Sequence, residues 1–113
     1  MRMIYLAGPM TDVPGHNIEK FNRKASELFG DGWVVVNPAE IGDEFGDWDE
    51  VNADPERLKK LFHAEWSALA ECDAIYLMRG WERSKGSRLE LKIALDLGLE
   101  IVLEPTNENE REN

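Results

Sequence analysis

The chain has 113 residues, a length that suits one domain with a core large enough to fold alone. Hydrophobic residues make up 42% of it, which indicates a globular protein and excludes a disordered one. The formal net charge of −10 argues against nucleic acid as a partner, because phosphate backbones bind clustered Lys and Arg. No apolar run reaches the length of a membrane span, and we see no signal peptide before the first expected strand. With the lone Cys72, this predicts a cytoplasmic protein without a membrane partner.

The first half of the chain alternates apolar runs with one helical pattern. Residues 3–7 are expected to form a buried strand, residues 18–29 a helix, and residues 33–36 a second buried strand. From residue 37 to Pro55 the sequence is rich in Gly and acids and shows no clear period. A structureless loop of this length is typical of a lid or a binding segment.

The second half repeats the alternation. Asp54-Pro55 predicts the start of a second helix, because it places a hydrogen-bond acceptor at the cap and proline in the first turn. A strand over residues 74–78, a helix over 87–97 and a strand over 99–103 follow. Residues 104–113 have no apolar periodicity and are expected to form an acidic, disordered tail.

This order of strands and helices predicts an α/β fold: a small three-layer sandwich around a four-stranded parallel sheet. Right-handed crossovers give the strand order 2-1-3-4, a Rossmann-like or flavodoxin-like arrangement. Ligands of such sheets bind at the carboxyl ends of the strands. The segments 8–15, 37 onward and 79–87 should therefore converge on one crevice.

Glu90 is the leading candidate for a functional residue. It shares the inward face of the expected 87–97 helix with Ile93, Ala94 and Leu97. The Ser/Gly-rich turn before it offers backbone N–H groups at a helix N-terminus, which suit an anion such as phosphate. Ser87-x-x-Glu90 also matches the capping box, in which Glu bonds back to the cap, so a purely structural role stays open.

Glu65 also points inward, because it continues the apolar stripe that begins at Leu58. Two inward acids on neighbouring elements suggest a carboxylate pair, in which one becomes a proton donor or acceptor while the other stays charged. Cleavage of a glycosidic bond requires such a pair. Tyr5 lies in the first strand, close to its carboxyl end, where it either orients Glu90 or packs in the core.

Polar and aromatic residues at the strand ends supply the remaining candidates. Gly8-Pro9 allows close backbone approach or simply forms a turn. Ser84, Gly86 and Ser87 could bind phosphate, with nearby basic residues either adding charge or forming a solvated face. Trp81 could stack on a nucleobase, whereas packing is the expectation for Trp48 and Trp66.

Metal and dinucleotide motifs are missing from the sequence. His16 and His63 have no metal-ligand spacing, and the acids between residues 43 and 54 do not match a calcium loop. No Gly-x-Gly-x-x-Gly follows the first strand, which argues against NAD. We therefore expect neither a metal nor a cofactor.

Three stretches carry a resemblance to a known family: Tyr5-Leu6-Ala7-Gly8-Pro9-Met10, the segment from Glu65 to Asp73, and the segment from Gly80 to Glu90. They resemble the nucleoside 2-deoxyribosyltransferase superfamily, and most of all a compact, phage-associated branch of unassigned biochemistry. The likeness extends over the chain to Leu103. The chain is also similar to 2'-deoxynucleoside 5'-phosphate N-hydrolases, whose Ser-x-Gly-x-x-x-Glu pattern is matched by Ser84, Gly86 and Glu90.

The resemblance implies a role for each matching residue. Glu90 would be the nucleophile that attacks the anomeric carbon of deoxyribose, and Tyr5 would support it. Glu65 would contact the sugar or base, while Ser84 and Gly86 would hold the 5'-phosphate or 5'-hydroxyl. The resemblance also implies one domain over residues 1–103, a nucleoside or nucleotide substrate, and a homodimer or higher homo-oligomer with sites at the subunit interface.

Two positions depart from the family pattern. Glu65 stands where Asp is usual, and Gly8-Pro9-Met10-Thr11 replaces a Gly/Ser/Arg-type loop, with a proline that has no N–H to offer a phosphate. We expect cleavage of the N-glycosidic bond of a deoxynucleoside or its 5'-monophosphate through a covalent deoxyribosyl-Glu intermediate, by hydrolysis or base transfer. The alternative is a catalytically inactive nucleotide-binding or sensor module. The expected catalytic residues are Glu90, Glu65 and Tyr5, and the expected substrate-binding residues are Gly8, Pro9, Met10, Asn37, Trp81, Ser84, Gly86 and Ser87.

Overall fold

The computed structural model describes residues 2–10 and 13–105 of the chain. Four parallel strands form its sheet: β1 (Met3–Ala7), β2 (Val34–Val36), β3 (Ala74–Leu77) and β4 (Glu100–Leu103). The strand order is β2-β1-β3-β4, which confirms the order predicted from the sequence and gives a flavodoxin-like topology. In register, Tyr5 of β1 lies between Val36 of β2 and Ile75 of β3.

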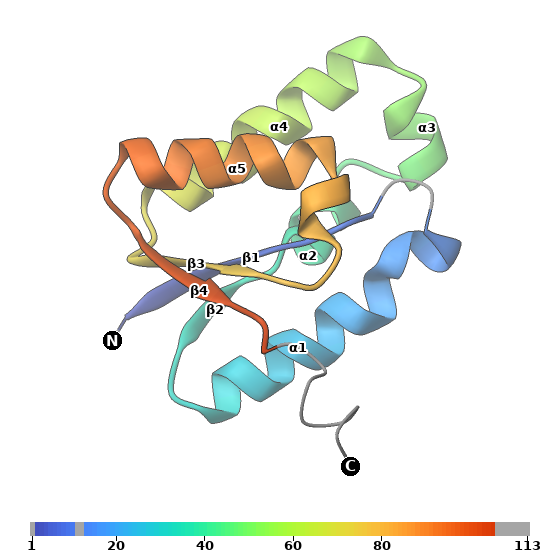
Figure 1. Cartoon of the computed structure of the whole chain (residues 1–113). Helices are drawn as coiled ribbons and strands as arrows, with labels where there is room; N and C mark the ends of the chain where they lie inside the picture. Colours follow the sequence, from blue (N-terminus) through green and yellow to red (C-terminus); the bar gives the residue numbers. More distant parts are fainter. Residues whose placement is uncertain (1, 11–12, 106–113) are drawn as a thin grey trace.

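Helices cover both faces of the sheet (Figure 1). The helix α1 (Ile18–Gly30) lies on one face, and α4 (Pro55–Ala70) and α5 (Lys85–Asp96) lie on the other. Side chains of β1 alternate between these layers, so that Leu6 packs with Phe21 of α1 and Tyr5 packs in the cluster that holds Ala94 of α5. The alternation therefore directs the phenol of Tyr5 toward α4 and α5.

The segment between β2 and α4 is not a structureless loop, and that expectation was wrong. It contains two short helices, α2 (Pro38–Asp43) and α3 (Trp48–Asn52). Each has a side-chain cap: Asn37 accepts a hydrogen bond from the N–H of Ala39, and Asp47 accepts one from the N–H of Asp49. Helices this short leave no readable hydrophobic period, so their capping residues were the only signal in the sequence.

Other boundaries also differ from the expectation. The strand β2 is an edge strand rather than a fully buried one, and Val34 is 38% exposed. The helix α5 begins at Lys85, before the expected residue 87. Short 3₁₀ turns, η1 (Pro14–Asn17) and η2 (Trp81–Arg83), precede α1 and α5. None of the described helices is long and apolar enough to cross a membrane.

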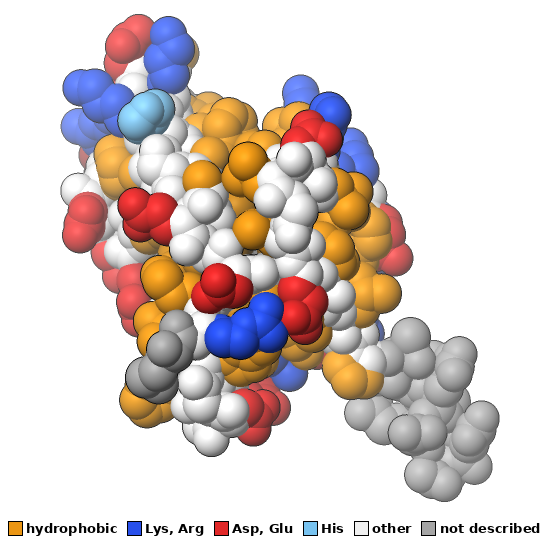
Figure 2. Space-filling view, turned by 90° about the vertical axis from the view of Figure 1, so that its left-hand side faces the viewer, with side chains coloured by type: hydrophobic (Ala, Val, Ile, Leu, Met, Phe, Trp, Pro, Cys, Tyr) orange, Lys and Arg blue, Asp and Glu red, His pale blue; other side chains and the backbone are white. Residues whose placement is uncertain are grey.

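Glu104, the first residue of the expected tail, is held against the sheet. Its N–H donates to the carbonyl of Leu77 at 2.9 Å, and its carboxylate accepts the N–H of Arg79 at 2.7 Å. Residues 106–113 of the expected tail lie outside the described residues. Figure 2 shows the face at the amino ends of the strands, where acidic and basic side chains are interspersed with apolar ones.

Candidate active site

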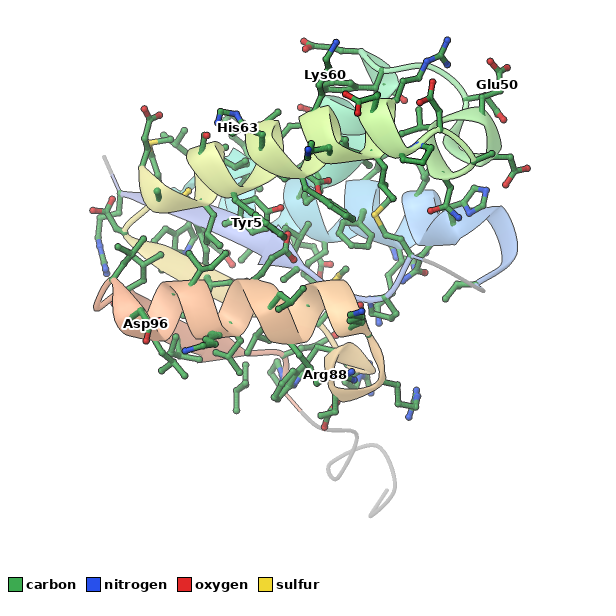
Figure 3. The ribbon with its side chains drawn as sticks, turned by 90° about the horizontal axis from the view of Figure 1, so that it is seen from above. Tyr5, Glu50, Lys60, His63, Arg88 and Asp96 are labelled. Carbon is green, nitrogen blue, oxygen red and sulfur yellow. The ribbon has the colours of Figure 1, made fainter. Side chains whose placement is uncertain are left out.

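A cavity of about 480 Å³ lies at the carboxyl end of β1. Its walls come from the segment after β1, from α4 and from the first turns of α5, which is where the predicted crevice was placed. Figure 3 shows Tyr5 between α4 and α5. The cavity is lined by, among others, Gly8, Pro9, Met10, Asn52, Leu58, Phe62, Glu65, Trp66, Arg83, Ser84, Lys85, Gly86, Ser87, Leu89 and Glu90.

Tyr5 and Glu90 form the central contact of the site. The hydroxyl of Tyr5 donates to Oε2 of Glu90 at 2.6 Å, across two elements that lie 85 residues apart in the sequence. Burial raises the pKa of Glu90 to about 7, and the hydrogen bond from Tyr5 lowers it. Burial and the nearby acids hold the pKa of Tyr5 well above its usual value, so its hydroxyl remains a donor. Tyr5 therefore orients Glu90 and stabilises its charged form.

The capping-box interpretation of Glu90 was wrong. The cap of α5 is Ser84, which has an extended backbone and whose Oγ accepts the N–H of Ser87 at 3.2 Å. Glu90 thus falls in the second turn of the helix, too far along to bond back to the cap. Its carboxylate contacts Tyr5 instead, and only 7% of the residue is exposed.

Glu65 lies on α4, also only 7% exposed, as the apolar stripe of that helix predicts. Burial and then the charge of Glu90 raise the pKa of Glu65 to about 8. Since this pKa lies above that of Glu90, Glu90 ionises first as the pH rises, and between the two values the pair combines an ionised Glu90 with a protonated Glu65. One carboxylate and one carboxylic acid thus line the same cavity.

The first turn of α5 forms one edge of the cavity. Ser87 is 1% exposed, and its Oγ has no hydrogen-bond partner within the described residues. Gly86 has no heavy atom within 4 Å of the place a Cβ would take, so its backbone is open to a ligand. The lining residues Arg83 and Lys85 make no ion pair with any described acid. This edge offers N–H groups, a hydroxyl and positive charge to an anion.

The segment after β1 lines the cavity as expected. Gly8, Pro9 and Met10 all contribute to the wall. A Cβ at Gly8 would lie 2.6 Å from Cε of Met78 and 3.1 Å from its Cβ, so glycine is what lets this segment pack beside β3. The lack of a side chain at Gly8 therefore lets the segment after β1 form this wall of the cavity.

Two expected ligand residues lie outside the cavity. Asn37 caps α2, and its Nδ2 donates to Oδ1 of Asn22 at 2.9 Å. Trp81 packs on the hydrophobic cluster that includes Tyr5 and Leu77. The side chain of Asn37 bonds to Ala39 and Asn22, and that of Trp81 packs on its hydrophobic cluster. A position at the end of a strand does not reveal these neighbours.

Other residues line the cavity without having been expected there. Trp66, expected to pack, does line it, and its ring is stacked on Phe62 with centroids 5.3 Å apart. Asn52 lines it from α3, where the sequence was interpreted as loop. The side chain of Trp48 lies outside what the structure describes. No three His, Cys, Asp or Glu residues gather as metal ligands within residues 2–10 and 13–105.

The family model for a domain of unknown function, DUF4406, matches residues 2–103, which is nearly the whole described chain. The chain belongs to the DUF4406 family. A comparison with curated proteins finds no match. In this DUF4406 protein, as in others, function depends on the cavity and its side chains rather than on the fold.

Proposed function

We propose that this DUF4406 protein cleaves the N-glycosidic bond of a deoxynucleoside 5'-monophosphate or deoxynucleoside through a covalent deoxyribosyl-Glu90 intermediate. The observation that carries the proposal is the buried Tyr5–Glu90 hydrogen bond, which lies beside a second buried acid at one cavity. A carboxylate for attack and an acid for the leaving group are what glycosidic cleavage requires. The resemblance of the same residues to nucleoside 2-deoxyribosyltransferases supports the choice of a deoxynucleoside.

The first step forms the glycosyl ester. An oxygen of Glu90 attacks C1' of the sugar, the C1'–N bond breaks, and its electron pair leaves with the base. Glu65 is protonated because burial and Glu90 raise its pKa to about 8, so it can donate its proton to the departing base. Tyr5 holds Glu90 in place through its hydrogen bond.

The second step releases the sugar. Water attacks C1' while the now ionised Glu65 takes its proton, and the C1'–O bond to Glu90 breaks to regenerate the carboxylate. A second base in place of water would give transfer instead of hydrolysis. Both outcomes return Glu65 and Glu90 to their starting protonation states.

The edge at α5 supports a 5'-monophosphate as the preferred form of the substrate. Within the described residues, the N–H groups of Lys85 and Gly86 and the Oγ of Ser87 have no hydrogen-bond partner. Together with the charge of Arg83, they suit a phosphate dianion. Ser84, which the resemblance assigns to the phosphate, already uses its Oγ as the cap of α5. Ser87 is therefore the hydroxyl that we assign to the phosphate.

The test is release of free base from a panel of deoxynucleosides and their 5'-monophosphates, followed by chromatography. Wild-type protein should release base, Glu90→Gln should not, and Glu71→Gln, which changes an exposed acid at the end of α4, should behave as wild type. Mass spectrometry of the intact protein after rapid quenching should detect a deoxyribosyl adduct that Glu90→Gln lacks. Equal release by wild type and Glu90→Gln would contradict the proposal. Nucleotide binding without any release would favour the inactive binding module.

A further inference from the structure

The cavity contains one side-chain amide among its described lining residues, that of Asn52. Asn52 is the last residue of α3, a helix held in place by Val51, which is 1% exposed. In the described part of the chain, the amide of Asn52 has no hydrogen-bond partner. The helix α3 thus carries an exposed polar group that is available to a ligand.

The position of Asn52 separates it from the reacting groups. Glu65 and Glu90 lie on the long helices, and the cations and Ser87 lie at the first turn of α5. Asn52 comes from α3, and Figure 3 shows Glu50 of the same helix on the α4 side of the molecule, away from Arg88 of α5. A ligand whose phosphate lies at α5 therefore extends its other end toward α3 and α4.

The wall beside Asn52 suits a flat ring. Leu58, Phe62 and Trp66 of α4 line it, and the rings of Phe62 and Trp66 are nearly parallel, with 6° between their planes. Such a surface binds any nucleobase through apolar contact, but it cannot distinguish one base from another. Discrimination needs a polar group that pairs with the edge of the base, and a carboxamide can both donate and accept there.

We propose that Asn52 reads the hydrogen-bonding edge of the nucleobase and sets base preference, an inference that rests on the proposed function of the same cavity. Its amide N–H₂ pairs with a keto oxygen or ring nitrogen, and its carbonyl pairs with an exocyclic amino group. A base that leaves either amide group unpaired binds less tightly, because that group loses water without gaining a partner.

The experiment compares kcat/KM for dAMP with dIMP, and for dCMP with dUMP, in wild type, Asn52→Ala and Asn52→Asp. The aspartate only accepts, so it should favour the amino-bearing dAMP and dCMP over their keto partners by about tenfold more than wild type does. Asn52→Ala should bring both ratios to within about threefold of one. Glu50→Gln, on the same helix, is the matched control and should leave both ratios unchanged, and circular dichroism checks that each variant is folded.

The outcomes separate this inference from the proposed function. Ratios within about twofold of wild type in both folded Asn52 variants would overturn the role of Asn52 while leaving glycosidic cleavage intact. If wild type releases no base, calorimetric dissociation constants of the same four nucleotides replace kcat/KM. A ratio of dissociation constants that Asn52→Asp shifts toward dAMP and dCMP would then support base reading without catalysis. Unchanged dissociation constants, or no binding of any of the four nucleotides, would overturn the inference.

Discussion

Replacing Glu65 with Gln should make the protein more stable in alkali than wild type. Glu65 is 93% buried, and its pKa is raised from 4.5 to about 8 by burial and by Glu90. The folded protein therefore binds this proton more tightly than the unfolded chain does. Between the two pKa values the unfolded state carries fewer protons, so stability falls as the pH rises. Glutamine keeps the shape of the side chain and removes the titration.

The size of the effect follows from linkage. Between about pH 5.5 and about pH 8.5, the shifted Glu65 removes on the order of 3 kcal/mol from the free energy of unfolding. Glu90, with its pKa at about 7, removes on the order of 2 kcal/mol over the same range. Wild type should thus lose about 5 kcal/mol through this pair, and Glu65→Gln about 2 kcal/mol.

Urea denaturation at the two pH values measures both losses. Other titrating groups contribute equally to wild type and variant, so the quantity to compare is the difference between their two losses. Glu71→Gln, with its exposed side chain, controls for the removal of one carboxylate and should follow wild type. If Glu65→Gln and wild type lose the same stability between the two pH values, the buried-acid reasoning is refuted.

Four further predictions concern the chemistry and the packing around the pair. The pH profile of kcat/KM should be a narrow bell, rising as Glu90 ionises near its pKa of about 7 and falling as Glu65 ionises near its pKa of about 8. Tyr5→Phe should move the rising limb to higher pH, because it removes the hydrogen bond that lowers the pKa of Glu90; an unmoved limb would show that Tyr5 does not control this carboxylate. Ser84→Ala should lower the free energy of unfolding by about 1 kcal/mol through loss of the α5 cap, whereas Ser87→Ala should not lower it and should raise KM only for 5'-monophosphates. Gly8→Ala should cost about 1–2 kcal/mol in urea denaturation through its clash with Met78, while Gly86→Ala, with open space around it, should be neutral or stabilising; equal effects would contradict the packing geometry.

Periodicity was sufficient to predict the sheet and the two inward acids. The apolar runs of β1 and β3 marked the strands, and the stripe from Leu58 to Leu69 placed Glu65 toward the core. These features depend on residues close in sequence, so a pattern records them directly. The inward positions of Glu65 and Glu90 are confirmed by their burial.

Sequence could not decide which serine caps α5. Ser84 and Ser87 both precede the helical pattern by a suitable spacing, and Ser87-x-x-Glu90 was the better match to the known motif. The turn η2 decides it, because it leaves Ser84 with the extended backbone that a cap requires. Sequence also could not decide which asparagine lines the cavity. The side chain of Asn37 bonds to Asn22 and caps α2, whereas Asn52 lines the cavity.

The buried acids also bear on the choice between an enzyme and a binding module. Burial of the carboxyl groups of Glu65 on α4 and Glu90 on α5 costs folding free energy at neutral pH and above. No ion pair with a described base offsets this cost. Nucleotide binding alone does not require these two acids, because N–H groups, hydroxyls and cations are the groups that bind a phosphate. Glycosidic cleavage, by contrast, requires both groups in different protonation states, and burial together with the Tyr5 hydrogen bond separates their pKa values in that direction. The cost in stability is therefore better explained by chemistry at Glu90 than by binding alone.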